Sequence, residues 1–200
     1  MIRKKIKRTV RISRYVFYRE TLIDKKAHLW AFLGSFAGIG IISYLQEFSL
    51  STQDNLFLIG SFGASSVLVY GITQSPFSQP RNLVGGHVIS ALAGVTVHML
   101  FPEVIWIAAP LAVSLSIVLM QITKTLHPPG GATALIAVIG TEKVKSLGYL
   151  YVLSPVFTGC FILLFTALIF NNMEKKYSYP ARRIRIPASL RKMSFSRKKR

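Results

Sequence analysis

The sequence predicts an all-α protein, a polytopic bundle of transmembrane helices, and three observations lead to this fold class. The 200 residues are 51% hydrophobic, yet they carry a formal net charge of +18. The charge is segregated, because residues 1–26 hold ten Lys or Arg and residues 175–200 hold eleven, whereas the stretch between them holds only four. A soluble domain has roughly a quarter of its residues charged. The middle of the chain therefore fits lipid better than water.

The third observation is a series of apolar stretches that divides this middle part. They cover about 28–46, 55–72, 83–101, 104–123, 126–140 and 148–170. A helix needs about 20 apolar residues to cross a hydrocarbon core, and the first, third, fourth and sixth stretches have this length. The second and fifth are shorter and rich in small residues. We expect about six short spans, four full and two short or re-entrant, and favour six crossings over four.

The charge pattern and the apolar stretches divide the chain into three regions. Residues 1–27 form a basic N-terminal arm, 28–171 the transmembrane domain and 172–200 a basic C-terminal tail. The positive-inside rule places both basic ends in the cytoplasm, so the number of crossings is even. The N-terminal stretch lacks the pattern of a cleaved leader, which favours a bacterial plasma (inner) membrane over an organelle. The tails are expected to contact anionic lipid headgroups rather than nucleic acid, because they lack regularly interleaved aromatic residues.

The two short stretches resemble each other, which suggests an internal repeat. Residues 63–71 read GASSVLVYG and residues 131–140 read GATALIAVIG. They would be the middle spans of two three-span halves with opposite orientations in the membrane. Short, glycine-interrupted segments at matching positions point to the binding site of a transporter. Two spans rich in Gly and Ala can also look alike by chance, so the inverted repeat is a hypothesis.

The strongest local motif is LHPPGGAT at residues 126–133. Two consecutive prolines cannot lie inside a helix but can begin one, so we expect a helix from near Pro129 to near Gly140, about 15–18 Å long. Its free N-terminal amides and the positive end of its dipole would form an anion site within the membrane. The alternative is a tight turn whose amides bond to loop carbonyls. The predicted anion-binding residues of the two short stretches are Gly63, Ala64, Ser65, Ser66, Gly130, Gly131 and Thr133.

Polar side chains near the spans complete the predicted site. His87 and His127 would lie at membrane depth, where polar groups are costly and tend to be functional. Arg81 and Asn82 precede the third stretch, and Arg81 could collect anions or be an ordinary positive-inside residue. The apolar stretches contain no Asp or Glu, and Cys160 is the only cysteine. We therefore predict no metal, no other cofactor and no enzymatic activity.

Small residues recur at four-residue spacing in two of the long stretches. Gly34 and Gly38 form one pair, and Gly86, Ser90 and Gly94 form a longer row. This spacing lets helix backbones approach closely in lipid, so tight helix packing is the expected role. A pore-lining role is the alternative.

Several motifs in order make the chain similar to the HPP family of small integral membrane proteins. The motifs are FGASS at 62–66, SQPRN at 78–82 with Gly86-His87 after it, and HPPGGATA at 127–134. The resemblance covers about residues 28–171. It implies four predicted spans, as family members are described, and it makes nitrite a candidate substrate, because plant-organelle and cyanobacterial relatives are associated with nitrite transport.

The sequence thus predicts a membrane transporter or channel for a small inorganic anion, with nitrite as first candidate. The main alternative is a structural or assembly subunit of a membrane complex that has no transport activity of its own. A homo-oligomer is compatible with the sequence, because six short helices enclose little interior.

Overall fold

The computed structural model describes residues 25–48, 60–173 and 178–181, and within these ranges the secondary structure is helical with no strand. The N-terminal arm up to residue 24 and most of the C-terminal tail lie outside the described residues. The described helices are α2 (Lys25–Glu47), α4 (Pro80–Leu100), α5 (Ile105–Thr123), α6 (Gly130–Ile139), α7 (Glu142–Ser146) and α8 (Thr158–Phe170), with the short turns η1 (Val67–Gly71), η2 (Pro76–Ser78) and η3 (Val152–Phe157). Residues 60–66 are helical and continue into η1.

Four described helices are long and apolar enough to cross a membrane. They are α2, α4, α5 and the continuous stretch Val152–Phe170, which joins η3 to α8. The backbone at Ser154 is not helical, so this last span is kinked where Pro155 follows. The helical bundle predicted from the segregated charge and the apolar stretches is therefore confirmed.

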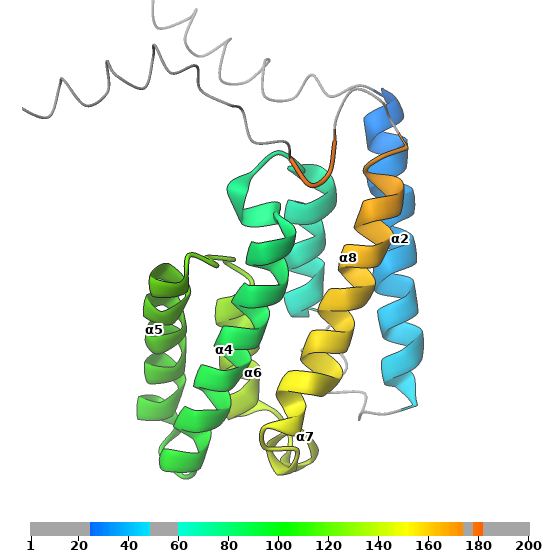
Figure 1. Ribbon diagram of the computed structural model, residues 1–200. Coiled ribbons are helices and arrows are strands. Elements are labelled where there is room, and N and C mark those ends of the chain that lie inside the picture. Colours follow the sequence, from blue (N-terminus) through cyan, green and yellow to red (C-terminus); the bar gives the residue numbers. More distant parts are fainter. Residues whose placement is uncertain (1–24, 49–59, 174–177, 182–200) are drawn as a thin grey trace, which may run out of the picture.

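The two short stretches are half-helices that run in opposite directions (Figure 1). Residues 60–71 begin near the middle of the bundle and run toward the end where α2 begins, whereas α6 begins at a similar depth and runs toward α7. An extended segment, residues 124–129, leads from the end of α5 to the start of α6. The helix expected after the two prolines is confirmed, since α6 begins at Gly130 and has ten residues. Residues 124–139 thus pass through the bundle as one extended half and one helical half.

The long helices pack in pairs that take one helix from each half of the chain. The helix α2 packs on α8, and α5 packs on α4. At the start of α6, a side chain added at Gly130 would meet the Gly86 carbonyl of α4 and the side chains near it. At the other half-helix, the ring of Phe62 lies directly against Gly159 of α8. Each half-helix therefore rests on a glycine of a different long helix.

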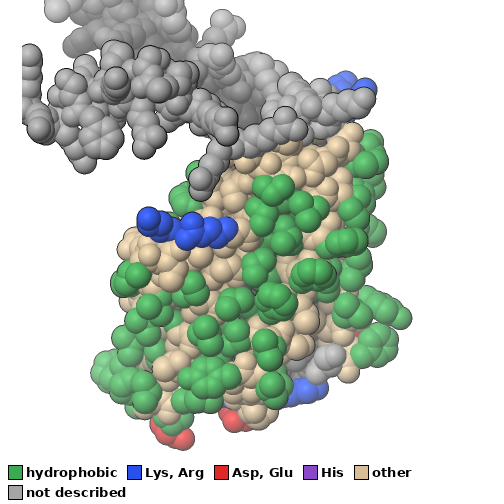
Figure 2. Space-filling model, viewed as in Figure 1, with side chains coloured by type: hydrophobic (Ala, Val, Ile, Leu, Met, Phe, Trp, Pro, Cys, Tyr) green, Lys and Arg blue, Asp and Glu red, His purple; other side chains and the backbone are tan. Residues whose placement is uncertain are grey.

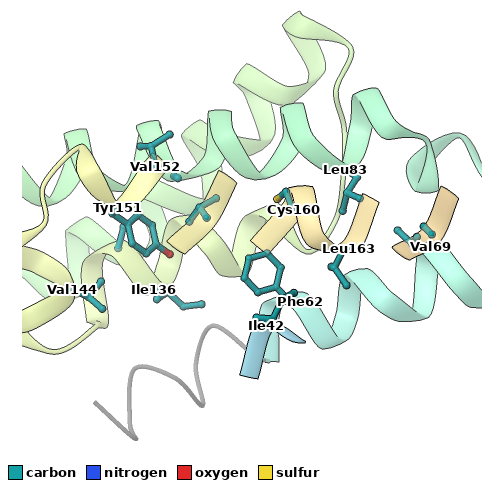
Figure 3. Packing of buried hydrophobic residues seen from close by; sticks show 14 of the residues in the cluster. Ile42, Phe62, Val69, Leu83, Ile136, Val144, Tyr151, Val152, Cys160 and Leu163 are labelled. Atoms are coloured by element: carbon teal, nitrogen blue, oxygen red, sulfur yellow. The ribbon is translucent and has the colours of Figure 1, made fainter. Parts of the chain in front are cut away.

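The core lies where these helices meet (Figure 3). Phe62 and Val69 of residues 60–71 contact buried residues of α2, α4 and α8, while Tyr151 and Val152 close the cluster at the end near α7. The small-residue rows serve this packing, as predicted. Gly34 and Gly38 make room for the Tyr70 side chain and α8, and Gly94 lies against the backbone of Ala134. These faces are occupied by the chain's own helices.

The outer surface is largely hydrophobic, with charged groups toward the two ends of the bundle (Figure 2). Large apolar side chains are strongly exposed, such as Phe36 at 71% and Trp106 at 78%, as a lipid-facing surface requires. We call the end where α2 and α4 begin the basic side; its described charged residues are Lys25, Lys26, Arg81 and Lys124. We call the opposite end the acidic side; its described charged residues are Glu47, Glu103, Glu142, Lys143 and Lys145.

Candidate functional site

Two histidines and three hydroxyl groups meet at the centre of the bundle and form what we call the histidine–hydroxyl cluster: Ser61, Ser65, His87, His127 and Thr133. The Ser65 hydroxyl lies 2.7 Å from His87 Nε2 and 3.0 Å from His127 Nε2. On the other side of the same ring, His87 Nδ1 lies 2.7 Å from the Thr133 hydroxyl. That hydroxyl is 2.8 Å from the Ser61 hydroxyl. The five side chains form one continuous hydrogen-bonded chain.

The five side chains come from four segments of the fold. Ser61 and Ser65 are one turn apart on the half-helix 60–71, and Thr133 is in the first turn of α6. In the repeat, Ser65 and Thr133 occupy matching positions, and both bond to the ring of His87 in α4. His127 comes from the extended segment before α6. The sequence folds this way because Pro128 and Pro129 keep that segment out of a helix until Gly130.

The cluster is closed off from its surroundings. The exposed fraction is 0% for Ser65, His87 and His127, 1% for Thr133 and 2% for Ser61. The imidazole rings of His87 and His127 lie 4.9 Å apart between centroids, and the Phe62 ring covers His87 at 5.3 Å. Polar groups at this depth cannot rely on water or lipid for partners, so the short bonds between them are what makes their burial tolerable.

Two backbone carbonyls terminate the chain. His127 Nδ1 lies 2.8 Å from the Phe77 carbonyl, which can only accept, so this ring nitrogen carries a hydrogen in the bonded state. At the other end, the Ser61 hydroxyl lies 3.1 Å from the Pro129 carbonyl. The Ser65 hydroxyl has a further acceptor, the Ser61 carbonyl, at 3.1 Å. The Tyr151 hydroxyl donates to the Thr133 carbonyl at 3.1 Å and so fixes the first turn of α6 from outside the cluster.

The prediction of free amides at the start of α6 is wrong. The amides of Gly130 and Gly131 donate to the carbonyls of His127 and Pro128, at 2.8 and 3.1 Å. Those of Ala132 and Thr133 donate to the Pro129 carbonyl at 3.1 and 3.3 Å. The physical reason is that Pro128 and Pro129 already form a turn, whose carbonyls cap the amides that a helix start would otherwise leave open. The polar groups offered at the centre are therefore side chains.

Several predicted residues of the half-helices lie beside the cluster and do not join it. Gly130 packs against α4, and Gly131 has open space around its Cα. Ala64 is exposed, while Gly63 and Ser66 line a groove of about 580 Å³ against α2. Residues four apart share one face of a helix, so Ser61 and Ser65 both face the centre of the bundle. Gly63, Ala64 and Ser66 lie on other faces of the same helix.

Arg81 and Asn82 hold the backbone near the site. Arg81 Nη2 donates to the Thr123 carbonyl at the end of α5, at 2.6 Å, and Asn82 Nδ2 donates to the Leu126 carbonyl at 2.7 Å. The distance along α4 from Arg81 to His87 is six residues, or about 9 Å. These two residues therefore position the extended segment that carries His127.

The rest of the SQPRN segment has the same role. The Ser78 hydroxyl lies 2.8 Å from both the Leu68 and the Ile72 carbonyls, where residues 60–71 end. Gln79 Nε2 donates to the Thr73 and Ser75 carbonyls at 3.0 and 2.8 Å. The segment thus joins the end of one half-helix to the approach of the other.

Residues 178–181, which the sequence analysis assigned to the basic tail, pack on this same end. The Tyr179 hydroxyl donates to the Ser78 carbonyl at 2.7 Å, and its backbone is held by Asn172. The Ala181 amide donates to Gln79 Oε1 at 2.8 Å. Burial raises the pKa of the Tyr179 hydroxyl, so it is a neutral donor at physiological pH.

Three contributors to the site were not predicted from the sequence. Ser61 lies four residues before Ser65, a spacing that places both on one helical face, and this signal could have identified it. The Phe77 carbonyl and the Tyr151 hydroxyl carry no local sequence signal, because only the tertiary fold brings them to His127 and α6. Within the described ranges, no group of three His, Cys, Asp or Glu side chains could hold a metal ion.

Comparisons with known proteins agree with this architecture. The family model described as "HPP, transmembrane region" matches residues 20–180. Two transmembrane proteins of Dictyostelium discoideum are 44% and 45% identical over 154 residues, which is 76% of this chain and 54% and 49% of those proteins. The chain thus spans about half the length of these curated relatives. No solved structure gives a significant match.

The family match covers most of the described bundle, including both half-helices and every residue of the histidine–hydroxyl cluster. The matched relatives are themselves transmembrane proteins. The chain is therefore an integral membrane protein that belongs to the HPP family.

Proposed function

We propose that the protein transports a small inorganic anion across the membrane, with nitrite as the first candidate, and that the histidine–hydroxyl cluster is its substrate site. One observation carries the proposal: five polar side chains are fully buried near the middle of the bundle, where α6 begins beside residues 60–71. Discontinuous helices that meet at the membrane midplane are the usual setting of transporter binding sites.

The electrostatics of this point favour an anion. Helix α6 begins here, so the positive end of its dipole faces this region. The hydroxyls and imidazoles can donate hydrogen bonds, and no bond links a described Asp or Glu side chain to the cluster. A nitrite-sized anion would exchange bonds with these side chains, since the backbone amides are already occupied.

The closed cluster corresponds to a substrate-free, occluded conformation. An anion enters only if the half-helices separate, and the two halves of an inverted repeat can do this alternately toward the two sides. The SQPRN segment and residues 178–181 hold the basic side closed, because their bonds link the end of residues 60–71 to the segment before α6.

Flux into liposomes tests the proposal. Purified protein is reconstituted, and uptake of nitrite, nitrate, formate and chloride is measured for the native chain and for Thr133→Val. We expect selective uptake of nitrite that falls at least about tenfold in the variant, because Val has the shape of Thr without its hydroxyl. A loss of one hydrogen bond of about 1.4 kcal/mol corresponds to this factor.

A matched control is Thr166→Val. Thr166 is also buried and its hydroxyl also bonds to another side chain, the Tyr70 hydroxyl at 2.7 Å, but it lies in α8 away from the cluster. Uptake should persist in this variant. Equal losses in both variants would show that the cluster is not the site, and an absence of flux for all four anions from folded native protein would sink the proposal.

A second candidate function is a structural or assembly subunit without transport activity of its own. The observation in its favour is the closure of the cluster, whose short bonds could simply stabilise the bundle. The small-residue rows do not support it, because Gly86 and Gly94 contact the chain's own segments. If the protein is such a subunit, the native chain shows no anion flux, and Thr133→Val only lowers its stability.

The remaining expectations extend the proposal. No enzymatic activity is proposed, and the partners proposed are the anion, anionic lipid headgroups at the basic arms, and a second copy of the chain. We place the basic side in the cytoplasm, since the described residues there include four Lys or Arg and no acidic residue. A bacterial plasma membrane stays a prediction from the sequence, and the two relatives above come from a eukaryote.

A further inference from the structure

We propose that the histidine–hydroxyl cluster binds one proton together with each anion, so that the protein is an electroneutral proton–anion cotransporter. This inference rests on the proposed function and adds its coupling. The cluster can supply fewer hydrogen atoms than there are hydrogen-bonded pairs in its geometry, and this difference is the basis of the inference.

The chain of contacts contains six consecutive pairs of polar atoms. They run from the Pro129 carbonyl through the hydroxyls of Ser61 and Thr133 to His87, and then through Ser65 and His127 to the Phe77 carbonyl. Every pair is between 2.7 and 3.1 Å apart. Both ends are carbonyls, which donate nothing.

The five side chains are one hydrogen short of these six pairs when both imidazoles are neutral. Each hydroxyl supplies one hydrogen and each neutral imidazole supplies one. If His127 donates to Phe77, one of the other five pairs lacks a hydrogen, for example the pair between Ser61 and Pro129, which are then two facing acceptors. If His127 carries its hydrogen on Nε2 instead, the facing acceptors are His127 Nδ1 and the Phe77 carbonyl. One pair is always without a hydrogen.

A sixth hydrogen fills all six pairs of this chain, and the further contact of the Ser65 hydroxyl, with the Ser61 carbonyl at 3.1 Å, is then the one that receives no hydrogen. With the charge on His87, its ring donates to both Ser65 and Thr133, Ser65 donates to His127, and Thr133 donates through Ser61 to Pro129. With the charge on His127, its ring donates to Phe77 and Ser65, and Ser65 donates to His87. The same geometry therefore accepts an excess proton on either histidine, and the proton passes between them when the Ser65 oxygen accepts a proton from one Nε2 and releases its own to the other.

Burial opposes this charge in the absence of an anion. Moving a cation away from water is costly unless it is paired, and a buried histidine alone is held neutral. The titratable groups that the adjoining elements contribute are Tyr70, Tyr151, Cys160 and Tyr179, and all are ordinarily neutral. Arg81, a charged residue of α4, is bonded at the end of α5. Among the described contacts, nothing supplies a negative counter-charge.

An entering monovalent anion provides that counter-charge. One proton and one anion then neutralise each other at the cluster, and both leave on the opposite side. The balance is one proton and one negative charge moved together, with no net charge transferred and no bond formed within the anion. Bound alone, either ion would remain an unpaired charge at membrane depth, which ties their movements to each other.

Liposomes under defined gradients test the coupling. Protein is reconstituted with valinomycin and potassium, so that the membrane potential and the pH difference are set independently, and nitrite uptake is followed with protein-free liposomes as the background. We expect the rate of uptake to be independent of the membrane potential and to depend on the pH difference. At equilibrium, a one-unit pH difference should accumulate the anion about tenfold on the alkaline side.

A variant pair separates the cluster from the other histidines. The double variant His87→Gln/His127→Gln removes both rings that can hold the excess proton, and it should lose accumulation driven by the pH difference. His98→Gln is the control, because His98 lies near the far end of α4 and outside the cluster. It should accumulate the anion like the native chain.

A second measurement reads the proton directly and does not depend on flux. With ¹⁵N-labelled histidine, nitrite added to native protein should shift two of the four histidines toward imidazolium-averaged nitrogen frequencies, and in His127→Gln a single histidine, His87, should show the shift. Uptake that follows the potential, with no nitrite-dependent shift, would overturn the coupling and leave anion transport standing. An absence of uptake for every anion would instead remove the proposed function, and the coupling with it.

Discussion

At the scale of single residues, Ser65 is the connection on which the site depends. Its hydroxyl is the one group that contacts both histidines, at 2.7 and 3.0 Å, and it is fully buried. A hydroxyl both donates and accepts, so it can link two imidazoles whichever of them carries the hydrogen. An alanine at this position would fit the space and leave both Nε2 atoms facing an apolar group.

Ser65→Ala is therefore expected to destabilise the protein by about 1–3 kcal/mol, because it leaves buried polar atoms unpaired. The corresponding fall in Tm is roughly 2–12 °C. The measurement uses the buried Cys160, the only cysteine in the sequence, whose reaction with a fluorogenic maleimide reports heat unfolding. Ser35→Ala is the control, since this hydroxyl is exposed and bonds only within its own helix. Equal Tm values for the two variants would contradict a buried cluster whose hydrogen bonds stabilise the fold.

The sequence predicted part of the candidate site, and the limits have physical causes. His87, His127, Ser65 and Thr133 were predicted because polar groups at membrane depth are rare and costly. Arg81 and Asn82 were assigned to the anion, whereas the structure shows them bonded to backbone carbonyls. Long side chains that cap a neighbouring helix look identical in sequence to side chains that bind a ligand.

At the scale of elements, the close contact between α4 and α6 decides where the cluster forms. A Cβ added at Gly94 would lie 2.9 Å from Ala134 Cα, so the two backbones touch without an intervening side chain. Gly130 lies similarly against Gly86 and Ser90. Because α6 is held this close along its length, Thr133 is brought within a hydrogen bond of His87.

Gly94→Ala should thus destabilise the bundle by about 1–3 kcal/mol, since an added methyl group meets backbone that has no rotamer to adopt. Gly40→Ala is a matched control on α2, where the added Cβ meets nothing within 4 Å. It should be neutral or stabilising by up to about 1 kcal/mol, because alanine favours a helix. Heat unfolding read at Cys160 distinguishes the two, and a Gly94 variant as stable as the Gly40 variant would contradict the packing described here.

The elements themselves were well predicted. The four long spans followed from the length of the apolar stretches, and the start of α6 followed from two consecutive prolines. The state of the α6 amides was not predictable in the same way. Whether a turn or a ligand satisfies them depends on the backbone angles of Pro128 and Pro129, which residue identity restricts only in part.

At the scale of the whole molecule, a six-crossing protein differs from a four-crossing one in whether residues 124–139 cross the membrane. If this segment crosses, α7 lies on the acidic side together with the turn between α4 and α5, as it does in the structure. If it returned to its own side, α7 would lie with Lys124.

Single cysteines placed at Lys124, Glu103 and Glu142, in a Cys160→Ala background, test this arrangement. All three positions are exposed. A membrane-impermeant maleimide applied to intact cells should label Glu103→Cys and Glu142→Cys, and should label Lys124→Cys only after the cells are opened. Labelling of Glu142→Cys together with Lys124→Cys would show that α6 does not complete a crossing, and the reverse pattern for all three would invert the orientation.

The lengths of the spans have a consequence for the membrane in which the protein can work. The helices α4 and α5 have 21 and 19 residues, which correspond to about 31 and 28 Å along their axes. Any tilt shortens the thickness that they cover. These two spans match an endoplasmic-reticulum bilayer of about 27 Å better than a sterol-rich plasma membrane of about 32–33 Å, whereas α2, with 23 residues, is long enough for either. Thick bilayers would have to thin around the protein, so lipids with shorter acyl chains should give the highest activity on reconstitution.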